Sequence, residues 1–140
     1  MVTADLEKVQ EIEMENPSHW SAKSLARELA VEQGIRLVAE DGGAQLLGWC
    51  ACRVIWPEAE LLKIAVKKLN RKRGLGRFLF IRLVEELQKR KITDLFLEVR
   101  SNNRIAQKFY EELGFSYSGL RPGYYTDPPD SATVMKKDIS

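Results

Sequence analysis

Apolar residues recur with two different spacings along this chain, and the spacing predicts which segments are helices and which are strands. Spacings of three and four, typical of amphipathic helices, mark residues 3–16, 21–34, 75–90 and 103–113. Alternation and short apolar runs, typical of strands, mark 35–54 with a break at 41–43, then 61–66, 93–100, 115–120 and 132–137. The order is two helices, three strands, a helix, a strand, a helix and two strands, which predicts a mixed α+β domain.

The same pattern predicts which faces of these elements are buried. In the strand 93–100, Leu95, Leu97 and Val99 share one face and Glu98 lies on the other. The helix 75–90 is apolar over much of its circumference, so we expect it to be well covered. In the helix 103–113 we expect a buried stripe made by Ile105, Phe109 and Leu113. We expect residues 123–130 to form the connection between the last two strands.

The segment from Leu61 to Arg77 combines an apolar strand with a basic, glycine-containing connection at the start of a helix. Helix N-termini present free N–H groups and a positive dipole end, so cations gathered there favour a bound anion. A dinucleotide fingerprint would need glycine at Leu79, and a nucleotide-hydrolase loop would need Gly-Lys-Ser/Thr; both are absent. We predict an anion site at Arg71, Lys72, Arg73, Gly74, Leu75, Gly76 and Arg77, the alternative being a basic surface loop.

Composition limits what else the chain contains. With 140 residues, 44% of them hydrophobic, we expect one domain spanning 1–140. The net charge of +2 is too balanced for a general nucleic-acid binder. No apolar run is long enough to cross a bilayer, so we expect no membrane partner and a cytoplasmic location. Cys50 and Cys52 are predicted to be buried reduced thiols, and His19 is the only histidine, so no metal site is expected.

The pattern Arg-x-x-Gly-x-Gly at 71–76 lies between a strand and a helix, where it resembles the pyrophosphate loop of the GNAT family of N-acetyltransferases. The runs 97–100 and 109–115, with Asn103 between them, are similar to the RimI-like branch, which acetylates the N-terminal amine of a ribosomal protein. Arg121 and the pair Tyr124-Tyr125 also resemble that branch. The resemblance covers nearly the whole chain and implies the GNAT fold, a twisted mixed sheet of about six or seven strands flanked by about four helices.

The resemblance also implies roles for individual residues. Acetyl transfer from a thioester to an amine needs a neutral amine, support for the oxyanion and a proton for the departing thiolate. Matched positions make Glu98 the general base, through a water, and Tyr110 the general acid. Asn103 would hold acetyl-CoA, and the backbone of Ile64, Ala65 and Val66 would pair with the pantetheine arm. Without the resemblance, Glu98 reads as a solvent-facing strand residue, Tyr110 as a core-edge residue and Asn103 as a helix N-cap.

The pKa of an amine indicates how easily it can act as the acceptor. Lysine has an ordinary pKa near 10.4 and a chain N-terminus one near 7.8, so presenting neutral lysine costs about 3.5 kcal/mol more. This difference favours a protein N-terminus, such as that of a ribosomal protein, as the acceptor. We expect Trp20, Tyr124 and Tyr125 to form the walls of a peptide groove. Lys63 departs from the branch pattern, in which relatives more often carry a small or neutral polar residue at this position. A cation near the acceptor site would repel an incoming ammonium group or favour an acidic substrate. The alternatives are a GNAT that acetylates a small-molecule amine, a non-catalytic acyl-CoA-binding module, and a basic nucleic-acid-binding domain.

Overall fold

The structure is a computed structural model that describes residues 5–15, 27, 34–43, 45–68, 71 and 74–140. This part of the chain forms three helices and six strands. In chain order they are α1 (Leu6–Met14), β1 (Gly34–Glu40), β2 (Leu46–Ile55), β3 (Glu58–Val66), α3 (Leu75–Lys89), β4 (Asp94–Arg100), α4 (Arg104–Glu112), β5 (Ser116–Thr126) and β6 (Pro129–Asp138). The mixed α+β prediction is confirmed, and the predicted helix 21–34 lies almost entirely outside the described residues.

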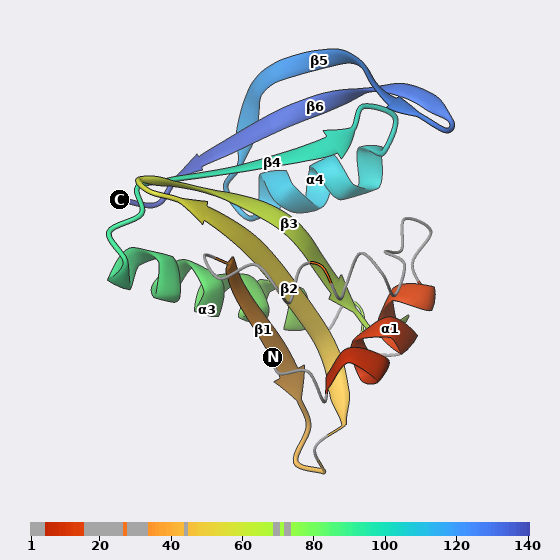
Figure 1. The fold of residues 1–140 in the computed structure, drawn as a ribbon, viewed down its shortest axis with the longest axis vertical. Coiled ribbons are helices and arrows are strands. Elements are labelled where there is room, and N and C mark those ends of the chain that lie inside the picture. Colours follow the sequence, from red (N-terminus) through yellow and green to blue (C-terminus); the bar gives the residue numbers. More distant parts are fainter. Residues whose placement is uncertain (1–4, 16–26, 28–33, 44, 69–70, 72–73) are drawn as a thin grey trace.

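The six strands form one sheet in the order β1-β2-β3-β4-β6-β5. Every neighbouring pair is antiparallel except β3 and β4, which run parallel. That parallel ladder is short, because it joins only residues 58–60 of β3 to residues 94–96 of β4. Beyond these residues the two strands diverge, as Figure 1 shows.

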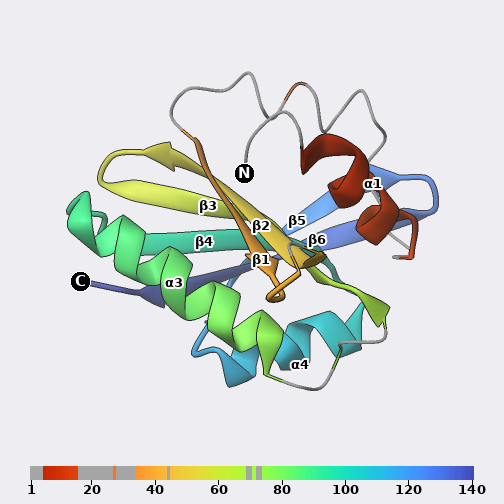
Figure 2. The ribbon, with the colours of Figure 1, turned by 90° about the horizontal axis from the view of Figure 1, so that it is seen from below.

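Helices cover both faces of the sheet (Figure 2), with α1 on one face and α3 and α4 on the other. The larger core lies on the α3 side, where the predicted inward face of β4 is confirmed by the burial of Leu95, Leu97 and Val99. Both cysteines are free and buried in this core. A smaller core lies under α1 and comprises Val9, Ile12, Leu46, Trp49, Ala51 and Ala65.

A β-bulge in β3 changes which side chains reach each core. Ala51 of β2 pairs with Lys63 and Cys52 pairs with Leu61, so Leu62 has no partner on β2. Before the bulge Leu61 faces the α3 side, and after it Ala65 lies in the core under α1. Because side chains alternate along a strand, the extra residue moves the whole second half of β3 by one face.

A buried ion pair joins α1 to this second half of β3. Lys63 Nζ lies 3.3 Å from Glu13 Oε1, with the two side chains 9% and 0% exposed. Trp49 Nε1 donates a hydrogen bond to the other carboxylate oxygen, Oε2, at 3.2 Å. Burial lowers the pKa of Lys63, and the attraction of Glu13 opposes that shift. The cation expected near the acceptor is therefore buried and neutralised by Glu13.

Three predictions from the hydrophobic pattern are wrong. Residues 123–130 are not a loop, because β5 and β6 extend through most of them and leave only a turn at 127–128. In the stripe predicted for the helix α4, Phe109 and Leu113 do pack on the core, but Ile105 is 87% exposed, and Ala106 and Tyr110 are covered in its place. Helix α3 is less covered than expected, since Phe78 and Ile81 are 56% and 49% exposed.

Candidate functional site

The divergence of β3 from β4 leaves backbone edges outside the parallel ladder. Residues 61–66 of β3 pair with β2 on one side, while the ladder to β4 ends at Glu60. The predicted pantetheine-binding segment, Ile64 to Val66, lies in this part of β3. A strand edge outside a ladder offers N–H and C=O groups to an extended ligand, as in strand addition.

Helix α3 begins near the end of β3 and carries the two glycines singled out from the sequence. Gly74 is its N-cap residue, with φ of 77° in the left-handed region that favours glycine. Gly76 packs closely, because a Cβ built on it would lie 3.2 Å from Phe109 of α4 and 3.8 Å from Val66 of β3. The first turn of α3 contains no acidic residue. The end of β3, the start of α3 and α4 therefore meet around Gly76.

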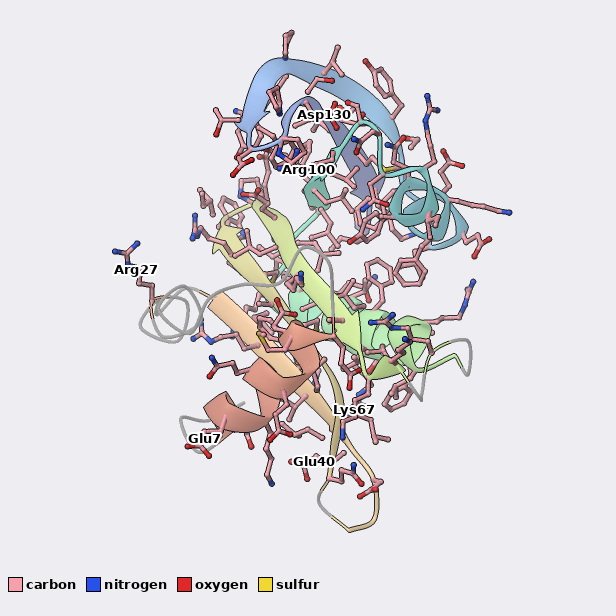
Figure 3. The ribbon with its side chains drawn as sticks, turned by 90° about the vertical axis from the view of Figure 1, so that its right-hand side faces the viewer. Glu7, Arg27, Glu40, Lys67, Arg100 and Asp130 are labelled. Atoms are coloured by element: carbon pink, nitrogen blue, oxygen red, sulfur yellow. The ribbon has the colours of Figure 1, made fainter. Side chains whose placement is uncertain are left out.

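The basic residues before α3 do not all face an open site. Arg71 donates from Nε to the backbone carbonyl of Val66 at 3.2 Å and from Nη2 to that of Glu15 at 3.4 Å. Arg77 lies in the first turn of α3 and is exposed. Lys72 and Arg73 lie outside the described residues. Figure 3 shows Lys67 where β3 ends, away from Arg100.

Asn103 is the N-cap residue of α4, as the alternative interpretation expected. Its Oδ1 accepts a hydrogen bond from the backbone N–H of Ala106 at 3.1 Å. This bond satisfies one of the free donors at the helix start. None of the described residues accepts a hydrogen bond from the side-chain amide nitrogen of Asn103.

Glu98 lies on the face of β4 opposite the α3 core and is held by β5. Its Oε1 accepts a hydrogen bond from Arg121 Nη1 at 3.0 Å, and its side chain is 19% exposed. Oε2 is buried and accepts no hydrogen bond within ordinary geometry from the described residues. Tyr124 is close enough for a weak polar interaction, since hydrogen bonding to Glu98, followed by burial, raises the pKa of Tyr124.

The predicted substrate tyrosines lie on β5 beside Glu98. The rings of Tyr124 and Tyr125 meet edge to face with centroids 5.0 Å apart. The guanidinium of Arg100 lies 4.2 Å from the Tyr125 ring centroid and donates to the backbone carbonyls of residues 127 and 128. The structure therefore brings Tyr124 and Tyr125 together with Glu98. Trp20 lies outside the described residues.

Tyr110 reaches the site from α4, on the other side of the sheet from Glu98. Its ring packs against Phe109 and Phe115, with centroids 5.5 and 5.9 Å away. Burial raises the pKa of Tyr110 to about 12, with a smaller contribution from Tyr125. The hydroxyl therefore stays protonated at neutral pH and can donate but not accept a proton. No hydrogen bond joins Tyr110 to Glu98.

A second carboxylate, Glu60, was missed by the sequence reasoning. It is the last β3 residue paired with β4, opposite Phe96, and shares the α1 face with Glu98. Burial and then the charge of Glu98 raise the pKa of Glu60, while Arg53 and Arg121 oppose the shift. In the sequence it is one polar position of an alternating strand, and only the parallel register places it near Glu98.

The part of the chain that the structure describes contains neither a metal-binding cluster nor a membrane-spanning helix. No group of three or more His, Cys, Asp or Glu side chains there is arranged to hold a metal ion. None of the described helices is long and apolar enough to span a bilayer.

Comparison with known proteins gives one consistent family. The model of the Acetyltransferase (GNAT) family matches residues 6–115. The chain is 35% identical over 141 residues to the [ribosomal protein bS18]-alanine N-acetyltransferase of Escherichia coli (strain K12), covering 99% of the chain and 94% of that relative. The Haemophilus influenzae enzyme of the same name is 30% identical over 138 residues, covering 94% of the chain and 90% of the relative. The crystal structure of the ribosomal-protein-S18-alanine N-acetyltransferase from Escherichia coli superposes with a TM-score of 0.89 and 34% identity, covering 100% of the chain and 91% of that structure.

Proposed function

The chain belongs to the GNAT family of acetyltransferases, and we propose that it transfers an acetyl group from acetyl-CoA to the N-terminal α-amine of ribosomal protein bS18. The observation that carries this proposal is the 35% identity to a bS18-alanine N-acetyltransferase over 99% of the chain. We further propose that residues 1–140 act as a single domain and that the reaction takes place in the cytoplasm, where ribosomal proteins are made.

The described residues fit acetyl-CoA, the acyl donor of the family. The β3 edge at Ile64, Ala65 and Val66 lies outside the ladder to β4 and suits an extended pantetheine arm. The first turn of α3, with Gly74, Leu75, Gly76 and Arg77, offers N–H groups to the pyrophosphate. The remaining residues proposed for the donor are Arg71, Lys72, Arg73 and Asn103.

Glu98 is proposed as the general base. Arg121 holds one carboxylate oxygen, which leaves the buried Oε2 without a donor among the described residues and able to accept a proton, directly or through a water. Glu98 takes one proton from the acceptor ammonium, and the neutral amine then forms its N–C bond with the acetyl carbonyl carbon as the C–S bond breaks. The nitrogen loses a second proton to solvent as it becomes an amide, and solvent returns a proton to the acid after the thiolate has been protonated. Tyr110, protonated with its pKa near 12, is proposed to give a proton to the departing thiolate.

Direct transfer is favoured over a covalent enzyme intermediate. Cys50 and Cys52 are the only cysteines in the chain, and both are buried in the larger core. Burial raises the pKa of the Cys50 thiol to about 12, so almost no thiolate forms at neutral pH. These thiols therefore lack the properties of a nucleophile.

The acceptor peptide is proposed to bind on the α1 face, beside Glu98. Tyr124 and Tyr125 form an aromatic pair there, and tyrosines are well suited to peptide contacts because each offers an apolar ring and a polar tip. Trp20 is proposed as a further wall of this groove.

The experiment that tests the proposal measures thiol release from acetyl-CoA with three acceptors. They are a peptide with the bS18 N-terminal sequence, the same peptide N-terminally blocked but containing lysine, and a mixture of polyamines and amino sugars. Turnover with the free N-terminus alone is expected. Turnover with the small amines and none with the peptide would refute the assignment of the acceptor.

Two matched variants test the role of Glu98. Glu98→Gln should lower kcat by about 10²-fold or more, as loss of a general base does. Glu112→Gln removes a carboxylate from an exposed position of α4 and should leave kcat unchanged. Equal rates in the two variants would refute the role of Glu98 while leaving the choice of acceptor open to the peptide assay.

A further inference from the structure

Glu15, the C-cap residue of α1, is bonded at two points to the connection between β3 and α3. Its carboxylate oxygen Oε2 accepts a hydrogen bond from the backbone N–H of Lys68 at 2.6 Å, across 53 positions of sequence. Its backbone carbonyl accepts from Arg71 Nη2 at 3.4 Å. Arg71 also donates from Nε to the carbonyl of Val66 at 3.2 Å, so it links the end of α1 to the end of β3.

Helix α1 is itself fixed to the sheet two residues before Glu15, at Glu13. The ion pair of Glu13 with Lys63 is buried, and Trp49 donates to the same carboxylate. Lys63 lies on β3 only a few residues before Lys68. The end of α1 is therefore held to β3 by the buried contacts of Glu13, and to the start of the β3 to α3 connection by the exposed contacts of Glu15.

Glu15 can affect donor binding in two opposite ways, through its negative charge and through its hydrogen bond to the backbone. A carboxylate repels a phosphate anion bound in its vicinity, and this repulsion alone would weaken donor binding. Its short bond to the Lys68 N–H has the opposite effect, because it fixes the backbone at Lys68, just after the end of β3. Preorganising a binding segment raises affinity by reducing the entropy lost on binding.

We propose that Glu15 is a positioning residue for acetyl-CoA: it holds the described residues between β3 and α3 in place so that the first turn of α3 faces the pyrophosphate. This inference rests on the donor part of the proposed function. It assigns a role in donor binding to α1, a helix that lies on the face proposed for the acceptor.

The test measures the Kd for coenzyme A by calorimetry, with no acceptor present, for the wild type and three variants. Glu15→Ala removes both the charge and the acceptor oxygen, and should raise Kd about five-fold, as expected for loss of one charged hydrogen bond that is partly exposed. Glu15→Gln keeps an acceptor oxygen and removes the charge, so its Kd should equal or fall below that of the wild type. Glu11→Ala removes an exposed carboxylate from the same helix and is the control, with unchanged Kd.

The sign of these changes separates positioning from charge. Tighter binding by both Glu15 variants would show that Glu15 acts only as a repelling charge, which overturns the proposal. Unchanged binding by Glu15→Ala would overturn it as well. A second measurement, hydrogen exchange in the free protein, should show faster exchange of the Lys68 amide in Glu15→Ala than in Glu11→Ala, and equal exchange would contradict the proposed hold.

Failure of the proposed function gives a different result. A wild type that binds coenzyme A but acetylates no peptide refutes the acceptor assignment and leaves the role of Glu15 measurable. A wild type that does not bind coenzyme A overturns both the donor assignment and the role of Glu15.

Discussion

Replacing Lys63 with methionine tests whether the ion pair under α1 holds this helix on the sheet. Lys63→Met keeps an unbranched side chain of similar length and removes the cation that faces Glu13. The Glu13 carboxylate, 0% exposed, then stays buried next to Trp49, whose Nε1–H still donates to it. The variant therefore exposes the cost of a buried carboxylate that has lost its cationic partner.

The size of the effect follows from the burial of both groups. Removing one partner of a buried ion pair costs about 3–5 kcal/mol. Because the Trp49 bond remains, we expect a value near the lower end, about 3 kcal/mol, equivalent to a fall in Tm of about 6–12 °C for a chain of this size. The double variant Glu13→Gln/Lys63→Met removes both charges and should lie within about 1 kcal/mol of the wild type.

The assay is urea denaturation at pH 7, with unfolding monitored by circular dichroism. Lys89→Met is the matched control, because Lys89 also pairs with a glutamate, Glu86, at 3.0 Å, but the two side chains are 70% and 41% exposed. Exposed pairs contribute little, so this variant should unfold at the same urea concentration as the wild type. The reasoning is refuted if Lys63→Met is as stable as the wild type, or if the double variant is the least stable of the set.

Three further predictions concern the site and the packing of α4. Glu98→Gln should lower kcat most at neutral pH and less as the pH rises, since the acceptor amine then loses its own proton; a constant ratio to wild type from pH 7 to about pH 10 would argue against the base role. Because the pKa of Glu60 is raised above 4.5, the folded state holds this proton more tightly, so stability falls as pH rises through the window above 4.5. Glu60→Gln should accordingly raise Tm slightly at pH 7, by about 1 °C, and not at pH 4, where a gain of equal size would contradict the shift. Leu113→Ala should cost about 2–5 kcal/mol and Ile105→Ala almost nothing in chemical denaturation, and equal losses would contradict the orientation of α4.

The period of apolar residues predicted the type of nearly every described element, because each strand or helix must bury one face. The prediction of the buried face failed where two faces of a helix are similarly apolar. In α4, Phe109 packs on the core and has apolar neighbours on two sides, Ile105 on one and Ala106 with Tyr110 on the other. Only the position of the sheet decides that Ala106 and Tyr110 are covered and that Ile105 is exposed. A helix with apolar residues on more than one side does not specify its own rotation.

The last hairpin failed for a different reason. Residues 123–130 contain proline, glycine and aspartate and no aliphatic run, which is typical of a loop. In the structure β5 is the edge strand and most of its side chains are exposed, so burial imposes no alternating pattern on it. The backbone ladder to β6 holds this strand, and backbone pairing leaves little trace in side-chain type.

The candidate site was partly predictable from residue type and partly dependent on geometry. Glu98 and Tyr110 were predicted as base and acid through the resemblance to the RimI-like branch, and the structure places them on different sides of the sheet. Arg71 was expected to bind an anion, and its guanidinium instead donates to two backbone carbonyls in this structure. A sequence shows that a cation is present but not which acceptor lies within reach of it.

The short parallel ladder between β3 and β4 explains why the proposed base and acid can act on one bond from opposite sides. Glu98 belongs to the face that carries α1 and the tyrosine pair, whereas Tyr110 belongs to the face that carries α3 and α4. Past Glu60 the two strands are no longer hydrogen-bonded, so the amine and the thioester can meet between them without breaking the sheet. If Glu98 and Tyr110 act as we propose, acceptor and donor occupy separate faces and both can be bound at once, as direct transfer requires.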